Sequence, residues 1–568
     1  MNKMKNLLTI VLLFVISAIF AQTFTNPIIR GGHPDPSICR VGDDYYIVNS
    51  TFEYFPALPI HHSKDLVNWE LIGYGIHRPS QGSGVVNLVD VQQDGGIHAP
   101  SIRYHNGLFY IIVTNVYTPT DRSKPTDMVN FIITAENPAG PWSEPHHIEG
   151  APGIDPDIFF DENGTVWFVG THDTGQPDAN GIGEIWVQEL DLENWKLKGE
   201  RYSIWRGACG GCCVEGPHIY QQHGRYYLLV AEGGTGPNHA VMMATSDKIM
   251  GQYESNPRNP ILTSRHLSNK NWVHSTGHAD LVELPDGRWY MVALGKRNEG
   301  YGDTNMGRET HLIPVIWEPA IARWEEVRKG IWEPVEYLWP VAAPETGKVE
   351  RSTTPLPFKD QPQYYNDAFS DNFDSERLHL EWNFRRVPKP NTYSLTANPG
   401  FLRMHLQPET FTLRERYSAI GFRQKESEFE YALKMNFKPR QDQAEAGMSL
   451  FLQDDQYIHF TLKKEKGEPV LQLKTYTKKE QEKVVKQEKL SGYQGTLVFK
   501  VISKNSQYQY LYSLDGISFL PFSETPDNLL ICRSYIGGNL GIYTSSNGQA
   551  TKEYADFDWV RYQGFTRQ

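Results

Sequence analysis

Acidic and imidazole side chains recur at one place in a repeated phrase of the sequence, where they could transfer protons together. The phrase begins at five positions that stand 64, 56, 61 and 62 residues apart, namely Asp35, Ala99, Asp155, Gly216 and His278, and Glu215 directly precedes the fourth of them. If each copy is the same strand of a repeated unit, these first positions converge on one pocket. Charged groups are rarely buried together without a task.

Three carboxylates in such a pocket would suit the hydrolysis of a glycosidic bond. One carboxylate activates water, and a second, kept protonated, donates its proton to the leaving oxygen. The third carboxylate also has a use, because a negative neighbour raises the pKa of the proton donor, as burial does.

Each of these residues also has a simpler interpretation. Aspartate before proline is common in turns. Glu215 could brace the next strand, and His278 could be a core imidazole whose hydrogen bonds are satisfied. Repetition at equivalent positions favours the catalytic interpretation for the acids.

A second repeated phrase indicates the elements that must position these residues. It is a polar turn followed by aromatic and β-branched residues, and its five copies begin at Gly42, His105, Asp161, His223 and Pro285. Each copy indicates a hairpin that enters a buried strand. Short strands repeated about every 60 residues, with almost no helical periodicity, are typical of β-propeller blades. The sequence therefore predicts an all-β chain that begins with a five-bladed β-propeller.

The repeat is lost before a second all-β region. From Phe369 onward, alternating strands are joined by lysine-rich segments, which we expect to be solvated hairpin tips. Residues 369–373 and 555–562 resemble the paired first and last strands of an antiparallel β-sandwich. Five prolines between 340 and 362 mark the crossing. We therefore expect a propeller at 22–339, a linker at 340–363 and a concanavalin-like β-sandwich at 364–568.

The N-terminus predicts a secretory signal peptide at residues 1–21. Lys3 and Lys5 precede an apolar or small stretch from Leu7 to Phe20, which Ala21 follows. That stretch is shorter than the ~18 residues needed to cross a bilayer, so we expect no membrane insertion of the mature chain. The expected location is secreted or periplasmic.

Charge and cysteine content make nucleic acid and structural zinc unfavourable partners. With 55 basic and 67 acidic residues the net charge is −12, which disfavours nucleic acid. The cysteines, Cys39, Cys209, Cys212, Cys213 and Cys532, are odd in number, so at least one should stay free in an oxidising compartment. The cluster at 209–213 has no second ligand pair nearby, which disfavours structural zinc.

Several motifs, in this order and spacing, make the chain resemble glycoside hydrolase family 43. These five-bladed propellers include exo-acting β-xylosidases and α-L-arabinofuranosidases. The motifs are Asn26-Pro-Ile-Ile29, His33-Pro-Asp-Pro-Ser37, Ile154-Asp-Pro-Asp-Ile-Phe-Phe160, Val214-Glu-Gly-Pro-His218, Glu232-Gly-Gly-Thr-Gly236, Gly277-His-Ala-Asp-Leu281 and Gly307-Arg-Glu-Thr310. The resemblance spans nearly the whole mature chain, and the C-terminal part looks like the concanavalin-like sandwich of the β-xylosidase branch.

Carried over residue by residue, the resemblance implies a role for each acid. Asp35 is the implied general base, Asp155 tunes the pKa of the acid and orients the substrate, and Glu215 is the implied general acid. The implied mechanism is a single displacement with inversion, in which the base and acid carboxyls stand ~6.5 to 9.5 Å apart. Arg308 matches an arginine that holds the sugar in the innermost subsite.

The resemblance also bears on metals and on the shape of the site. His278 matches a channel histidine that in some members coordinates calcium, directly or through water. Calcium prefers oxygen ligands, so such an ion would be structural, and no cofactor is required. In the β-xylosidase branch the sandwich lends a loop to the rim of the site. A pocket closed in this way fits the removal of one terminal sugar.

Two departures from the family pattern concern the sugar pocket. Where many relatives have tryptophan before Ala-Pro, this chain has His98, which offers less apolar area and a hydrogen bond. Phe52 could supply the missing apolar contact or could belong to the core. Cys212 and Cys213 lie two to three residues before Glu215, where they either line the pocket or are buried small residues.

These residues lead to one expected function and two alternatives. We expect an exo-acting, inverting hydrolase that removes terminal α-L-arabinofuranose or β-D-xylose from plant cell-wall polysaccharide or oligosaccharide. The choice between the two pentoses stays open, with a slight preference for arabinofuranose because of His98. A retaining fructan-type propeller hydrolase lacks support, because its Asn-Asp-Pro-Asn and Arg-Asp-Pro motifs are missing. A non-catalytic carbohydrate-binding propeller would share the fold, but we would expect it to lose one of the three acids.

Overall fold

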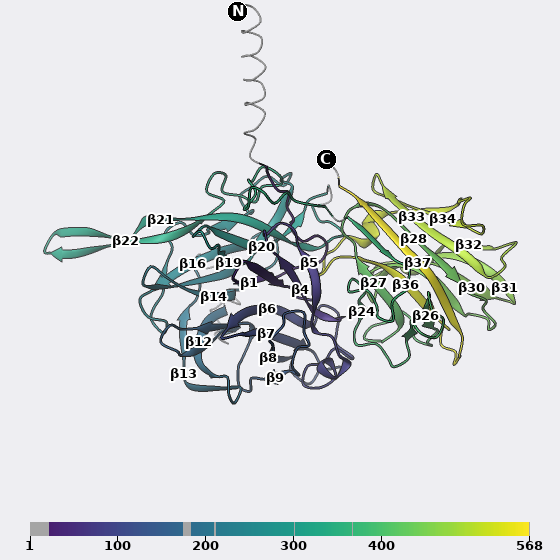
Figure 1. The fold of residues 1–568 in the computed structure, drawn as a ribbon, viewed down its shortest axis with the longest axis horizontal. Helices are drawn as coiled ribbons and strands as arrows, with labels where there is room; N and C mark the ends of the chain where they lie inside the picture. The colour runs from purple at the N-terminus through teal and green to yellow at the C-terminus, as the bar shows by residue number, and fades with distance from the viewer. Residues whose placement is uncertain (1–21, 174–182, 209–211, 300–301, 366, 567–568) are drawn as a thin grey trace, which may run out of the picture.

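The computed structural model describes residues 22–173, 183–208, 212–299, 302–365 and 367–566 (Figure 1). These residues form β-strands joined by turns, with two short 3-10 helices, η1 (Pro79–Gly82) and η2 (Asp527–Leu530). Among them, no helix has the length and apolar character to cross a membrane. The prediction of an all-β chain is confirmed. The predicted signal peptide, residues 1–21, lies outside the described residues.

Five antiparallel sheets follow one another in the N-terminal part of the described chain. The first contains β1 (Ser37–Val41), β2 (Asp44–Val48), β4 (Ala57–Ser63) and β5 (Glu70–Ile76). The second contains β6 (Gly96–His105), β7 (Leu108–Tyr117), β8 (Asp127–Ala135) and β9 (His146–His147). The third contains β10 (Ile154–Phe160), β11 (Val166–Asp173), β12 (Gly183–Asp191) and β13 (Lys196–Trp205). The fourth contains β14 (Glu215–Gln222), β15 (Arg225–Glu232), β16 (Ala240–Ser246), β17 (Glu254–Ser255) and β18 (Leu262–Thr263). The fifth contains β19 (Val273–Glu283), β20 (Trp289–Arg297), β21 (Arg308–Arg328) and β22 (Ile331–Ala342).

The first strands of these sheets are neighbours in space. β1 contacts β6, β6 contacts β10, β10 contacts β14, β14 contacts β19, and β19 contacts β1. The middle strands are buried on both faces, as the consecutive residues Ile111, Ile112 and Val113 of β7 show by their complete burial. Such continuous apolar runs are expected where each sheet is covered on both sides.

The C-terminal part forms two larger antiparallel sheets, on the right in Figure 1. One contains β23 (Ala368–Asp371), β25 (Tyr393–Ser394), β26 (Leu402–His405), β28 (Glu428–Asn436), β33 (Thr496–Lys504), β34 (Gln507–Ser513), β35 (Leu520–Pro526) and β37 (Tyr554–Phe565). The other contains β27 (Ser418–Arg423), β29 (Glu445–Gln453), β30 (Gln456–Glu465), β31 (Glu468–Thr477), β32 (Gln481–Lys489) and β36 (Asn539–Ser545). Along β28 buried apolar residues alternate with more exposed ones, so one face of this sheet packs on the core. As expected from the sequence, β23 pairs with the last strand, β37.

A bulge at the start of the inner strands aims the repeated residues. All five first positions have a left-handed backbone, with φ of 50° at Asp35, 39° at Ala99, 54° at Asp155, 59° at Gly216 and 45° at His278. The pairing register shifts around this point in β6, β10, β14 and β19. Such a bulge turns a side chain away from the regular alternation of the strand. Each copy of the repeated phrase therefore forms a strand and a bulge that turns its first side chain.

The two parts of the chain are joined by pairing and by buried charges. β3 (Tyr54–Phe55) pairs with β24 (Phe384–Arg385), a strand from the C-terminal part. Next to this pair, the Arg385 guanidinium, fully buried, lies 2.5 Å from a Glu53 carboxylate oxygen and 3.1 Å from one of Asp454. Removing one partner of such a pair leaves an uncompensated buried charge, which is strongly destabilising. The junction therefore fixes the C-terminal part relative to the first sheet.

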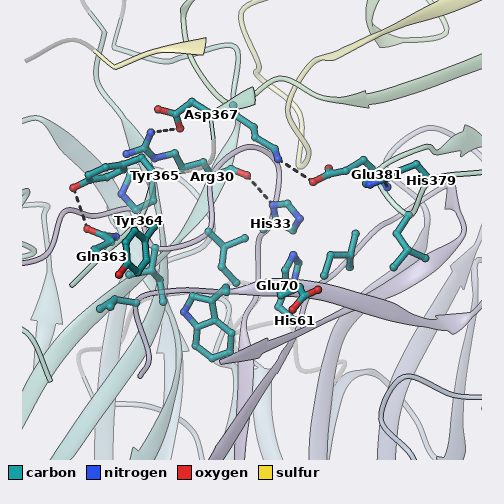
Figure 2. Close-up of a pocket in the computed structure, with 18 of the residues that line it drawn as sticks. Arg30, His33, His61, Glu70, Gln363, Tyr364, Tyr365, Asp367, His379 and Glu381 are labelled. Carbon is teal, nitrogen blue, oxygen red and sulfur yellow. Dashed lines mark hydrogen bonds and ion pairs between the residues drawn. The ribbon is translucent and has the colours of Figure 1, made fainter. Parts of the chain in front are cut away.

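A cavity of about 820 Å³, lined by both polar and apolar side chains, also lies at this junction (Figure 2). Arg30 donates a hydrogen bond across it to Asp367, and the rings of His33 and His61 contact edge to face at 4.9 Å. Asp35 follows His33 by two residues, yet neither Asp35 nor the other two repeated acids line this cavity. The cavity is therefore separate from the cluster of acids.

Candidate active site

The structure brings Asp35, His278 and Arg308 into contact. Arg308, the first residue of β21, donates a hydrogen bond from Nη1 to Asp35 Oδ1 at 2.9 Å. His278 Nδ1 lies 4.0 Å from the same oxygen. All three side chains are buried. Strands at opposite ends of the repeat therefore meet at one carboxylate.

The surroundings of Asp35 keep its carboxylate ionised. Burial alone would raise the pKa of Asp35, but the Arg308 charge, then His278 and a hydrogen bond from the Ser50 hydroxyl, hold it below its ordinary value. Burial in turn lowers the pKa of His278 to about 4, so this imidazole is neutral near pH 7. An ionised, buried carboxylate can accept a proton from water.

Asp155 and Glu215 form the second half of the site. The pKa of Asp155 is raised well above its ordinary value by burial and by the charges of Glu215 and Asp35. Burial, and then the charge of Asp35, raise the pKa of Glu215 to about 7. Two coupled acids of this kind titrate as a pair.

One backbone contact opposes the rise in the pKa of Asp155. The Gly216 N–H donates a hydrogen bond to Asp155 Oδ2 at 3.1 Å. A donor of this kind favours the ionised form of Asp155, although burial and the two neighbouring acids still raise the pKa of Asp155 well above its ordinary value. Glycine suits position 216, because φ is positive there and a Cβ would lie 3.0 Å from the His278 ring.

Aromatic rings from both parts of the chain stand beside Arg308. The Arg308 guanidinium lies 5.5 Å from the Phe52 ring centre and 5.1 Å from that of Tyr535, which precedes β36. Phe52 contacts His98 edge to face at 4.8 Å and Tyr535 at 5.3 Å. Phe52 is 1% exposed whereas Tyr535 is 37% exposed, so Tyr535 offers the open aromatic surface.

Tyr535 was not singled out by the sequence. The resemblance implied a loop of the sandwich at the rim without indicating which residue it contributes. The Tyr535 carbonyl accepts a hydrogen bond from Arg308 Nε at 3.0 Å, and Gly307 forms a β-bridge with Ile536. These contacts fix the loop to the same arginine that binds Asp35.

A second polar layer lies two residues further along the inner strands. The Arg103 guanidinium, on β6, donates hydrogen bonds to Asp157 at 2.6 Å and to Asp280 at 2.9 Å. The same group lies 2.9 Å from His218 Nδ1 and 3.3 Å from the Ser37 hydroxyl. This internal cation balances the negative charge of two buried acids.

A calcium ion at His278, which the resemblance allows, would find few ligands in the protein itself. Calcium prefers several oxygen ligands, and the carboxylate nearest to His278, that of Asp35, already binds Arg308. Within the described ranges, no group of three or more His, Cys, Asp or Glu side chains could hold a metal ion. The residues present do not fit a calcium cage, and no step proposed below passes through a metal.

The four cysteines in the described ranges are free. Cys39 and Cys532 are buried, whereas Cys212 and Cys213 are partly exposed. A Cβ placed on Gly234 would lie 3.8 Å and 3.7 Å from the sulfurs of Cys212 and Cys213, so the two thiols lie close to one another in space. In the sequence, both cysteines precede Glu215 by two to three residues. Cys209 lies outside the described residues.

Comparison with known proteins identifies the family. Residues 24–320 match the profile described as glycosyl hydrolases family 43, and residues 370–563 match the beta xylosidase C-terminal concanavalin A-like domain. The chain belongs to glycosyl hydrolase family 43. It is therefore a glycoside hydrolase, and the resemblance found in its motifs is confirmed.

Relatives in this family are similar over the full length. The chain is 37% identical to a xylosidase/arabinosidase of Butyrivibrio fibrisolvens, with 94% of this chain and 98% of the relative covered. It is 35% identical to a non-reducing end alpha-L-arabinofuranosidase of Bacteroides ovatus, with 99% of each chain covered. Among solved structures, the xyloglucan-locus family 43 protein B of Bacteroides ovatus superposes with a TM-score of 0.83 at 34% identity, covering 96% of this chain and 100% of that one.

The pKa values of this family 43 enzyme predict a bell-shaped pH profile of kcat/KM. The acid limb should lie below the ordinary pKa of aspartate, because Asp35 stays ionised down to that range. If Glu215 is the proton donor, as the resemblance implies, the basic limb should lie near pH 7, above which Glu215 loses its proton. Initial rates on an aryl glycoside across pH test both limbs.

In an Asp155→Asn variant the basic limb should move to lower pH, because the repulsion between the two acids is mutual. An unchanged basic limb would contradict the coupling.

Proposed function

We propose that this family 43 enzyme is an exo-acting, inverting hydrolase that removes terminal α-L-arabinofuranose or β-D-xylose from plant cell-wall polysaccharide or oligosaccharide. The observation that carries the proposal is the opposite state of two acids in one site. Asp35 is held ionised beside Arg308, while Glu215 has a pKa of about 7. The names of the relatives, xylosidase/arabinosidase and non-reducing end alpha-L-arabinofuranosidase, support the choice of pentose.

In the proposed reaction, one water molecule replaces the leaving group in a single step. Asp35 accepts a proton from the water molecule while the oxygen of that water bonds to the anomeric carbon. Glu215 gives its proton to the glycosidic oxygen as the bond from that oxygen to the anomeric carbon breaks. Asp35 ends protonated and Glu215 ionised, and exchange with solvent restores both. The sugar leaves with inverted configuration, because water attacks the face opposite the leaving group.

Support for exo action comes from the rim. Arg308 contacts both the Asp35 carboxylate and the ring of Tyr535, a residue of the C-terminal part. We expect this ring to close one side of the site, and a closed site suits a terminal sugar better than the interior of a chain.

The wider architecture and the location belong to the same proposal. Five successive sheets with neighbouring first strands support a five-bladed propeller at 22–339, followed by a linker at 340–363 and the sandwich at 364–568. The features of residues 1–21 support secretion or export to the periplasm, with polysaccharide or oligosaccharide as the partner.

A panel of two substrates and two readouts tests the proposal. Purified enzyme is given aryl β-xyloside and aryl α-L-arabinofuranoside, and the first product anomer is followed by NMR. We expect hydrolysis of at least one substrate, with inversion. Retention of configuration would overturn the mechanism, and no turnover of either substrate would overturn the proposed pentose specificity.

Replacing Tyr535 with alanine tests the role of the sandwich loop. We expect KM for the aryl glycoside to rise about fivefold, because an aromatic contact contributes about 1 kcal/mol, whereas kcat should change less. Tyr364→Ala is a matched control, since that ring is 75% exposed and does not contact Arg308. An unchanged KM for Tyr535→Ala would show that the ring does not contact the sugar.

A further inference from the structure

Asp94, in the turn before β6, contacts both His98 and the sandwich loop at residues 531–538, which carries Tyr535. Its carboxylate oxygen Oδ1 accepts a hydrogen bond from the Ser534 hydroxyl and one from the Tyr535 N–H at 3.5 Å. Its backbone carbonyl accepts a hydrogen bond from His98 Nε2 at 3.0 Å. One residue therefore connects the start of the second sheet with a loop of the C-terminal part.

The hydrogen bond to the Asp94 carbonyl also fixes the tautomer of His98. Burial lowers the pKa of His98 to about 4, so the imidazole is neutral near pH 7. Because a carbonyl can only accept, the hydrogen of the neutral ring lies on Nε2, and Nδ1 is left as an acceptor. The turn thus determines which hydrogen bond the imidazole can make with a ligand.

Asp94 is itself held in place by residues at the junction of the two parts. Its N–H donates a hydrogen bond to Glu53 Oε2 at 3.2 Å, and its Oδ2 accepts one from the Gln453 amide at 2.9 Å. Glu53 is in turn paired with the buried Arg385. The backbone of Asp94 has φ of 58°, in the left-handed region that aspartate tolerates. The carboxylate therefore has a defined position.

Other hydrogen bonds to the sandwich loop come from residues 304–308, before and at the start of β21. The Cys532 N–H donates to the Thr304 carbonyl at 3.1 Å, and the Tyr535 carbonyl accepts from Arg308 Nε. These contacts hold the loop to the fifth sheet. The Asp94 carboxylate holds it to the turn before the second sheet, beside His98.

We propose that Asp94 is a positioning residue that sets the distance between the rings of His98 and Tyr535, and thereby the fit of the terminal sugar. The two ring centres lie 6.0 Å apart, and both rings contact Phe52. Removing the carboxylate frees the Tyr535 side of this arrangement and leaves the carbonyl that orients His98. The inference rests on the proposed function, because it takes the sugar to bind beside these rings.

Kinetics of Asp94 variants on aryl α-L-arabinofuranoside and aryl β-xyloside test the proposal. D94G removes the carboxylate and keeps the left-handed backbone. We expect its KM to rise by up to about fivefold, as for loss of the aromatic contact itself, while kcat changes less. D94N should stay near the wild-type KM, because its amide oxygen still accepts from Ser534.

A double variant shows whether Asp94 acts through Tyr535. If the carboxylate serves to place that ring, D94G/Y535A should have the same KM as Y535A alone. A KM in the double variant that multiplies the two single effects would overturn the proposal.

S534A provides a second variant and D455N a matched control. S534A removes the hydroxyl that binds the Asp94 carboxylate, so its KM should rise in the same direction. Asp455 accepts a hydrogen bond from the Gln93 amide at 3.3 Å at the same junction. The described chain shows no hydrogen bond or ion pair between Asp455 and Tyr535, so D455N should keep the wild-type KM. An unchanged KM in both D94G and S534A would overturn the proposal.

Hydrogen exchange separates this inference from the proposed function. In D94G the peptide that contains Ser534 and Tyr535 should exchange faster than in the wild type, whereas in D455N it should not. A wild type that hydrolyses neither aryl pentoside would defeat the proposed pentose specificity, but exchange would still show whether Asp94 holds the loop. Equal exchange in D94G and the wild type would overturn the inference.

Discussion

Glu215→Gln should lower kcat/KM for an unactivated glycoside by about 10² to 10⁴-fold, the usual contribution of a general acid. Glutamine keeps the shape of the side chain but has no proton to give to the leaving oxygen. With a strongly acidic phenol as leaving group the loss should be much smaller, since such a group departs without protonation. Sugar affinity, measured by calorimetry with the free pentose, should be kept.

Parallel kinetics on the two aglycones separate this role from a structural one. The matched control is Glu162→Gln, the same change at an exposed turn, which should leave both rates unchanged. An equal loss on both aglycones would show that Glu215 does not donate the proton. A non-catalytic carbohydrate-binding propeller would show no hydrolysis of either aglycone even as the wild type.

Asp35→Asn should produce a loss of similar size, again about 10² to 10⁴-fold, but with every leaving group. Without an ionised carboxylate the attacking water is not activated, and a better leaving group does not replace that step. Asparagine is the informative substitution, because Asp35 has φ of 50° and asparagine tolerates the left-handed region.

The same variant should also move the basic limb of the pH profile. The charge of Asp35 is one cause of the raised pKa of Glu215, so its removal should shift that limb to lower pH. Thermal unfolding checks that the fold is intact. A loss that disappears with an activated aglycone would reverse the assignment of base and acid.

The sequence predicted much of this arrangement because it repeats. Copies of one phrase at similar spacing can be aligned without any structure, and the aligned first positions include Asp35, Asp155 and His278. The same alignment also contains Ser37, Asp157 and Asp280 two residues later. That second row could have predicted a polar layer, but its cation, Arg103, lies outside the shared phrase.

Other features could not be predicted from local sequence. Tyr535 reaches the site through tertiary packing, and its neighbours carry no repeated pattern. The length of the β21–β22 ribbon was also missed, because its alternating apolar and charged residues are typical of an ordinary half-buried strand. The pairing of β3 with β24 joins residues more than 300 positions apart, and short strands of two residues leave no periodic signal.

That pairing has a consequence for anyone who engineers substrate preference. In the proposed function, the surface that meets the sugar is contributed by two distant stretches of the gene. The buried ion pair of Glu53 and Arg385 helps to hold those stretches together. Mutagenesis limited to the first 339 codons would leave Tyr535 unchanged. A foreign C-terminal half without an equivalent of Arg385 would leave Glu53 without its ion-pair partner. Mutant libraries that aim to change substrate preference should vary both stretches together and keep the residues that join them, such as Glu53 and Arg385.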